Sequence, residues 1–324
     1  MEDPEFRHVV PAIEESNIRL SVLWQAPELA FSGLDRKILP GSVRAARTFV
    51  DFLRMILKNR LQQKETGSRD IFSFLQQFKD PDTGEGLSIK ELSAETATFL
   101  VAGKKIPSSP TAFDQVLILC ELLGTDTSST AMAGLAHYLM GSPCSYQRAA
   151  EEVRTTFASA EEIRLEVKIN SCVFLRACLD ESLRLSPPGG GPLWRVVEED
   201  GAVIDGEFIP GGCGVGAGVY AMHQSPANWT DPTSYKPERW LDKTGAQRPY
   251  FPFNIGPRSC VGKPLAVAQV MLTFARLLWE FDFGVPDGDN APAETSDMQP
   301  TQYVLRDHIT GHKEGPVLRF RPRF

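Results

Sequence analysis

The feature that most constrains this chain is a short, glycine-framed loop that carries a cysteine and leads directly into a long helix. Residues 251–266 read FPFNIGPRSCVGKPLA, and apolar residues continue at helical spacing to residue 281. Cys260 therefore lies just before a helix N-terminus and two residues after an arginine. The helix dipole and the nearby cation should both favour the thiolate form of its side chain. A buried free thiol, the commoner fate of a lone cysteine, would account for Cys260 but not for the residues at fixed offsets around it.

The rest of the chain indicates a mainly helical protein. Apolar residues at three- and four-residue steps predict helices over residues 42–63, 89–103, 147–157, 170–185 and 263–281. Between residues 186 and 255 the chain changes to proline, glycine and short alternating segments. There GAVIDGEFIPGG (201–212) predicts a hairpin, and the tail over 303–323 predicts another. The expected fold class is mainly α with small antiparallel β elements.

Composition excludes several classes of protein. The 324 residues, 42% hydrophobic and 23% charged, are typical of a globular chain with a sizeable core. A net charge of -7 argues against nucleic acid as the main partner, since phosphate binding needs a basic surface. The six cysteines form no CxxC pair, which favours a reducing compartment. No run approaches the roughly 18 apolar residues that a transmembrane helix needs.

Five positions of the cysteine loop stand at the offsets Phe-x-x-Gly-x-Arg-x-Cys-x-Gly, namely Phe253, Gly256, Arg258, Cys260 and Gly262. This spacing resembles the heme-binding loop of the cytochrome P450 family. The resemblance implies that Cys260 is the thiolate ligand of the iron of heme b and that Phe253 shields the sulfur. It also implies that Gly256 and Gly262 let the backbone turn close to the macrocycle and that Arg258 pairs with a heme propionate.

Other segments match the family in the same order along the chain. DESLRLSPP carries Glu181 and Arg184 one helical turn apart, and YKPERW carries Arg239. The resemblance implies that these three form a buried charge network, whereas Glu181 and Arg184 alone would read as an exposed ion pair. Arg195, in PLWRVV after a double proline, is the candidate for a second propionate contact.

The oxygen-binding helix of the family has a signature that this chain matches in an unusual way. Asp126 and Thr127 stand at its acid–threonine positions, but Leu123 occupies the place of a small residue. Removing the 21 residues 104–124 joins Ala102-Gly103 to Thr125 and restores the whole signature within one continuous helix. We therefore interpret 104–124 as a retained in-frame intron, with a genuine loop as the rival. Asp126 and Thr127 would relay protons toward the reacting oxygen, although a helix N-cap also explains them.

Taken over its whole length, 1–324, the chain resembles the C-terminal two-thirds of one fungal-type cytochrome P450 domain. The resemblance implies a monooxygenase that inserts one oxygen atom into a small hydrophobic substrate, in secondary metabolism or detoxification. Electrons would come from NADPH through NADPH–cytochrome P450 reductase. The full-length family member is expected in contact with the endoplasmic reticulum membrane, on its cytosolic face.

Two alternatives stay open from the residues. A heme-thiolate isomerase or dehydratase would share the cysteine loop without needing Asp126 and Thr127. An inactive product of a truncated gene would keep every motif. Two weaker patterns do not indicate a site. The Gly-x-Gly-x-x-Ala within 211–218 lacks a following crossover helix, and His308 and His312 lack both a helix and a third ligand.

Overall fold

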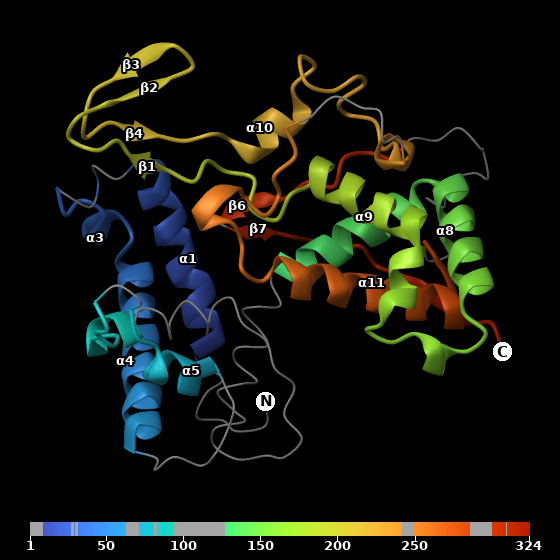
Figure 1. Cartoon of the computed structure of the whole chain (residues 1–324), viewed down its shortest axis with the longest axis horizontal. Helices are drawn as coiled ribbons and strands as arrows, with labels where there is room; N and C mark the ends of the chain where they lie inside the picture. The colour runs from blue at the N-terminus through green and yellow to red at the C-terminus, as the bar shows by residue number, and fades with distance from the viewer. Residues whose placement is uncertain are drawn as a thin grey trace. The chain divides into compact units, whose positions relative to one another are not determined.

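The computed structural model describes residues 9–26, 29, 32–62, 71–80, 83–93, 127–241, 249–285, 300–308 and 310–324. It divides the chain into two compact units, Met1–Asp126 and Thr127–Phe324, each described here by itself. Figure 1 labels most of their helices and strands. The predicted insert at 104–124 lies outside the described residues. Of the predicted helix 89–103, the structure describes residues 89–93, and these are helical.

The first unit contains a pair of packed helices, α1 (Val9–Gln25) and α4 (Pro40–Gln62), with the short helices α3 (Asp35–Ile38) and α5 (Ile71–Gln77). Polar side chains join α1 to the segment that follows it. Arg19 Nε donates to Asp35 Oδ2 at 2.8 Å, and Ser42 Oγ donates to Glu15 Oε1 at 2.9 Å. The helix expected over 42–63 is confirmed by α4.

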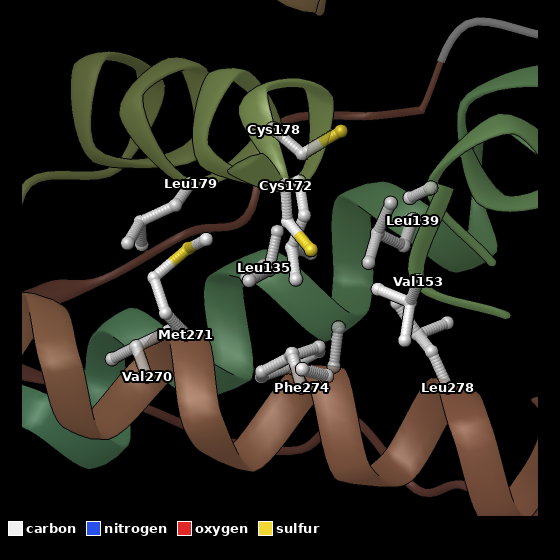
Figure 2. Packing of buried hydrophobic residues seen from close by; sticks show 14 of the residues in the cluster. Leu135, Leu139, Val153, Cys172, Cys178, Leu179, Val270, Met271, Phe274 and Leu278 are labelled. Atoms are coloured by element: carbon white, nitrogen blue, oxygen red, sulfur yellow. The ribbon is translucent and has the colours of Figure 1, made fainter. Parts of the chain in front are cut away.

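The second unit is built on four helices: residues 127–140, α8 (Pro143–Thr156), α9 (Val173–Leu185) and α11 (Lys263–Glu280). Short 3-10 segments, η2 (Ala160–Glu162) and η3 (Val167–Ser171), connect α8 to α9. Figure 2 shows Leu135 and Leu139 of the helix 127–140 packed between residues of α9 and of α11. Each such fully buried leucine contributes about 1.5–3 kcal/mol of transfer free energy, so the core holds these helices together.

Strands occur as four two-stranded antiparallel ladders, which confirms the predicted mainly helical class with small β elements among the described residues. The pairs are β1 (Arg195–Val196) with β4 (Gly214–Val215), β2 (Ala202–Ile204) with β3 (Glu207–Ile209), β5 (Phe281–Gly284) with β8 (Arg319–Pro322), and β6 (Arg306–His308) with β7 (Thr310–His312). The hairpin predicted at 201–212 is β2–β3. Its two turn residues, Asp205 and Gly206, have φ values of 51° and 84°, which suits a tight type I′ turn.

The C-terminal tail differs from the single hairpin expected over 303–323. β6 and β7 form a short hairpin, but β8 pairs with β5, which directly follows α11. In that ladder Phe283 lies opposite Phe320, with ring centroids 5.7 Å apart. The prediction of one local hairpin was wrong because β8 finds an apolar partner strand that is distant in sequence. Among the described helices, none combines the length and apolar character needed to cross a bilayer.

Candidate functional site

The cysteine loop, which we define as residues 251–262, folds back on itself. The Cys260 N–H donates to the Phe253 carbonyl at 2.8 Å, and the Ser259 N–H donates to the Gly256 carbonyl at 3.0 Å. These backbone bonds place Cys260 beside the start of the loop, while its side chain stays exposed. The loop therefore presents a thiol outward from a backbone that its own hydrogen bonds fix.

Two residues with positive φ make the turn possible. Asn254 has φ of 60° and Gly256 has φ of 72°, a left-handed conformation that glycine adopts freely and asparagine tolerates. Asn254 Oδ1 also accepts the Ile255 N–H at 2.9 Å. Gly262, by contrast, has an ordinary φ of -78° at the start of α11. The turn thus depends on Gly256, and its geometry does not require glycine at position 262.

The remaining loop residues differ in how firmly they are held. Phe253 is half-buried and packs against the core of the second unit. Arg258 lies in η5 (Gly256–Arg258) and is exposed, with its carbonyl accepting from Asn254 Nδ2 at 3.4 Å. No hydrogen bond or ion pair holds its guanidinium within the described ranges, so this cation can meet a carboxylate outside the chain.

The position of Cys260 can be compared with that of the cysteines in the core. Cys172 and Cys178 are fully buried, and burial raises the pKa of the Cys172 thiol to about 11. Burial likewise raises the pKa of Cys178 well above its ordinary value. A buried thiol that resists ionisation is a poor metal ligand, because the thiolate is the form that binds metal. Among the five cysteines that the structure describes, Cys260 combines exposure with a structured loop at the start of a helix.

The donor set around Cys260 fits a heme. Within the described residues no group of three or more histidine, cysteine or acidic side chains could hold a metal ion. Ile255, Val261 and Leu265, from the same loop and the first turn of α11, are exposed apolar side chains that suit contact with a flat apolar macrocycle.

A second cluster, the buried charge network, lies on α9 and the segment 230–240. Glu181 is fully buried, and its carboxylate accepts a bidentate pair from Arg184, with Nε–Oε2 at 2.9 Å and Nη2–Oε1 at 2.8 Å. It also accepts from Arg239 Nε at 3.2 Å, from Trp240 Nε1 at 3.0 Å and from the Lys236 N–H at 3.0 Å. The structure thus brings together Glu181, Arg184 and Arg239, the three residues that sequence reasoning grouped.

The two arginines of the network also hold backbone carbonyls. Arg184 donates to the carbonyls of His223 at 2.8 Å, Pro232 at 2.6 Å and Ser234 at 3.2 Å. Arg239 donates to two further carbonyls in this segment, those of Thr230 and Asp231. The network therefore ties α9 to the end of α10 and to the irregular segment 225–236, in which few backbone groups pair with one another.

The start of the cysteine loop is held by two side chains that sequence reasoning missed. His223, on α10 (Val219–Gln224), is fully buried, and its Nε2 accepts the Phe251 N–H at 3.0 Å. Tyr250 Oη donates to Asp180 Oδ1 of α9 at 2.9 Å. Burial, followed by the charge of Arg184, lowers the pKa of His223 to about 4, so its ring is neutral near pH 7. A single histidine in a short helix carries no sequence signal for this role.

The other predicted site residues are placed less tightly. Arg195 lies in β1 and is exposed, and its Nη1 donates to the carbonyls of Leu193 at 3.2 Å and Trp194 at 2.9 Å. Thr127 is exposed at the start of the described helix 127–140. Asp126 lies outside the described residues, so its contacts with Thr127 stay a prediction. No hydrogen bond joins Thr127 to the cysteine loop in the part of the chain that the structure describes.

Comparison with known proteins agrees with this arrangement. A family model described as "Cytochrome P450" matches residues 115–306, which is more than half of the chain. The chain is 53% identical over 331 positions to "Cytochrome P450 monooxygenase lcsN" of Purpureocillium lilacinum, with 100% of this chain and 92% of the relative covered.

Two further fungal relatives are similar over nearly the whole chain. The chain is 41% identical over 328 positions to a "Cytochrome P450 monooxygenase" of Gibberella zeae, covering 98% of this chain and 71% of the relative. It is 40% identical over 321 positions to "Cytochrome P450 monooxygenase poxM" of Penicillium oxalicum, covering 98% of this chain and 57% of that relative. The matched region contains both the cysteine loop and the buried charge network.

Proposed function

The chain belongs to the cytochrome P450 family, and from that premise we propose that it inserts one oxygen atom from dioxygen into a small hydrophobic substrate. By family it is an oxidoreductase of the monooxygenase type that uses heme iron. A role in fungal secondary metabolism or detoxification is part of the proposal, and the names of the fungal relatives support the monooxygenase chemistry.

The observation that carries the proposal is the exposed thiol of Cys260 on a loop that its own backbone bonds fix. In this proposal Cys260 ligates the iron of heme b, and Arg258 and Arg195 hold the propionates. When bound, heme supplies the redox chemistry that activates dioxygen. The Phe253 ring, half-buried next to Cys260, would limit access of water to the sulfur. Protein N–H groups near the sulfur would tune its electron donation.

The buried charge network would keep the loop in place during this chemistry. Glu181 accepts five hydrogen bonds, so both lone-pair-bearing oxygens of its carboxylate are satisfied without water. A charge that is buried and paired in this way cannot move without leaving a partner uncompensated. Arg184 and Arg239 therefore restrain the segment whose carbonyls they bind, and this segment precedes the cysteine loop in the chain.

Proton delivery is assigned to Asp126 and Thr127. A carboxylate beside a hydroxyl can pass a proton from solvent to a reacting oxygen, so that this oxygen departs as water. The exposed position of Thr127 at the start of the helix 127–140 is compatible with access from solvent. NADPH–cytochrome P450 reductase is the proposed electron donor, and the cytosolic face of the endoplasmic reticulum membrane is the proposed location.

The spectrum of the reduced, carbon-monoxide-bound chain tests this proposal. The chain is expressed with a heme supply, and a strongly red-shifted Soret band is expected from thiolate ligation. Cys260→Ser should abolish that band, whereas Cys213→Ser, which changes another exposed cysteine, should leave it intact. A wild-type chain that folds but shows no red-shifted band would overturn the assignment of Cys260 in this chain.

A further inference from the structure

His223 joins the buried charge network to the cysteine loop through two different atoms. Its backbone carbonyl accepts from Arg184 Nη1 at 2.8 Å. Its side-chain Nε2 accepts the backbone N–H of Phe251, the first residue of the cysteine loop, at 3.0 Å. One residue of α10 therefore links the guanidinium that is paired with Glu181 to the peptide from which the loop begins.

The connection continues from Phe251 to the sulfur-bearing residue. The Asn254 N–H donates to the Phe251 carbonyl at 2.9 Å, which closes the first turn of the loop. Phe253 lies within that turn, and its carbonyl accepts the Cys260 N–H at 2.8 Å. A displacement of the Phe251 peptide would therefore move the carbonyl that holds Cys260, because Phe253 lies only two positions further along the chain.

Ring contacts fix the orientation of the imidazole. The His223 ring stacks on Tyr250, with centroids 5.4 Å apart and an interplanar angle of 28°. It meets the Phe251 ring edge to face at 5.3 Å. The ring centroid of Tyr250 in turn lies 4.4 Å from that of Trp240, and Trp240 Nε1 donates to the Glu181 carboxylate. The same aromatic cluster thus contacts the loop on one side and the charge network on the other.

The protonation of the ring follows from these contacts. Nε2 can accept the Phe251 N–H only when it carries no proton, so the neutral ring has its hydrogen on Nδ1. Nδ1 is buried and has no hydrogen-bond partner among the described residues. Burying an unpartnered N–H is unfavourable, and an apolar side chain of similar size would avoid it. The contribution that distinguishes histidine from such a side chain is the acceptor at Nε2.

We propose that His223 is a positioning residue for the sulfur ligand: its Nε2 holds the peptide that opens the cysteine loop and so sets the direction in which Cys260 presents its thiolate. The part of this inference that concerns heme rests on the proposed function. The part that concerns the loop does not, because it rests on contacts within the chain.

The decisive variants differ in whether they keep the acceptor. His223→Gln places an amide oxygen near the position of Nε2, and His223→Phe keeps the aromatic stacking on Tyr250 but removes the acceptor. Leu278→Ala is the matched control, since Leu278 is a fully buried core residue of α11 and the hydrophobic cluster that contains it includes no residue of α10. It lowers stability without removing the bond to Phe251.

Amide hydrogen exchange on the purified chain without heme is the first readout. We expect His223→Phe to speed exchange of the Phe251 amide by at least about tenfold relative to neighbouring core amides, because its acceptor is gone. His223→Gln should restore most of the protection, and Leu278→Ala should change Phe251 no more than it changes the rest of the unit. Equal protection in all variants, or no difference between Gln and Phe, would overturn the proposal.

Two further measurements test the proposal by other means. One uses the wild type, so it does not depend on the variants folding, and the other uses the heme-loaded protein. Nitrogen-15 imidazole spectra of the wild type, assigned with His223→Gln, should show the neutral tautomer with hydrogen on Nδ1, and the Nε2–H tautomer would overturn the proposal. In the heme-loaded protein, His223→Phe should shift the reduced carbon-monoxide spectrum from the strongly red-shifted band toward one of shorter wavelength, with rescue by His223→Gln. If the wild type lacks the red-shifted band, the proposed function fails, while exchange and tautomer still decide the role of His223.

Discussion

The buried charge network and the cysteine loop lie close together in the chain and could hardly differ more in their surroundings. Glu181 and Arg184 are fully buried, and every oxygen of the carboxylate is hydrogen-bonded. Cys260 is exposed, and its backbone N–H is held by the Phe253 carbonyl of its own loop. A group that must meet a ligand cannot also be surrounded by protein, so its position has to be set by neighbours. The comparison shows that different residues hold the fold and meet the ligand: Glu181 and Arg184 do the first, and Cys260 is placed to do the second.

Breaking the charge network should have the largest effect on stability. Glu181→Ala leaves Arg184 and Arg239 buried without their carboxylate, and we expect a loss of about 3–5 kcal/mol in the free energy of unfolding. Urea denaturation measures this loss. Arg306→Ala is the control, because it removes an exposed ion pair with Glu314 and should cost less than about 1 kcal/mol. Similar losses in the two variants would contradict the contrast between buried and exposed pairs.

Acid should weaken the link between the network and the loop. Burial lowers the pKa of His223 from 6.5 to about 4. Between these two pH values the imidazole is therefore protonated in the unfolded chain and neutral in the folded chain. Stability contributed by the neutral ring is therefore complete above pH 6.5 and is lost as pH falls toward 4, by up to about 3 kcal/mol.

This pH dependence is measured as a difference between two proteins, since carboxylates titrate in the same range. Wild type and His223→Phe are unfolded with urea at several pH values between 4 and 7. The difference in their unfolding free energies should change across that window, with the wild type losing more on acidification. A constant difference would show that His223 does not exclude a proton in the folded state.

The turn of the cysteine loop offers a smaller test. Gly256 has φ of 72° and open space where a Cβ would be placed, so Gly256→Ala is disfavoured by backbone conformation alone, at about 1–2 kcal/mol. Gly262→Ala is the matched control. Its φ is -78°, and its Cβ would lie 3.7 Å from Cys260 Sγ, an ordinary contact. Thermal unfolding should separate the two variants, and an equal or greater loss at position 262 would refute this account of the turn.

Replacing the cysteine itself should have the smallest effect on the fold. Cys260→Ser changes an exposed side chain outside the core, and we expect less than about 0.5 kcal/mol in unfolding free energy measured without heme. The same substitution should remove the red-shifted carbon-monoxide band entirely. A large loss of stability would mean that Cys260 supports the fold, and the division between rigid and reactive residues would then fail.

Local patterns predicted much of the fold. The apolar periodicity predicted the helices α4, α9 and α11, because each helix buries one face and the residues of that face recur every three or four positions along the chain. The β2–β3 hairpin was likewise visible, since Asp205-Gly206 suits its turn. The helix α1 was not predicted, and Pro11 and the polar residues around Ser16 interrupt its apolar pattern.

Long-range pairings were not predictable in the same way. The partner of β8 is β5, more than 30 residues earlier, and the sequence of β8, RFRP, does not indicate which strand it pairs with. Trp240 directly follows Arg239 in the sequence, but its bond to Glu181 depends on how η4 (Pro237–Trp240) packs on α9. His223 and Phe251 are 28 residues apart and belong to no common motif.

By itself, the sequence determined the chemical groups of this protein and their local geometry: a cysteine before α11, a glycine able to turn at position 256, and a glutamate and an arginine on one face of α9. These follow from helical spacing and from the conformations open to each residue type. Only the tertiary structure decided which groups are buried, which exposed, and which hold one another. Burial and hydrogen bonding between distant segments depend on how the helices pack, and that packing is a property of the whole chain.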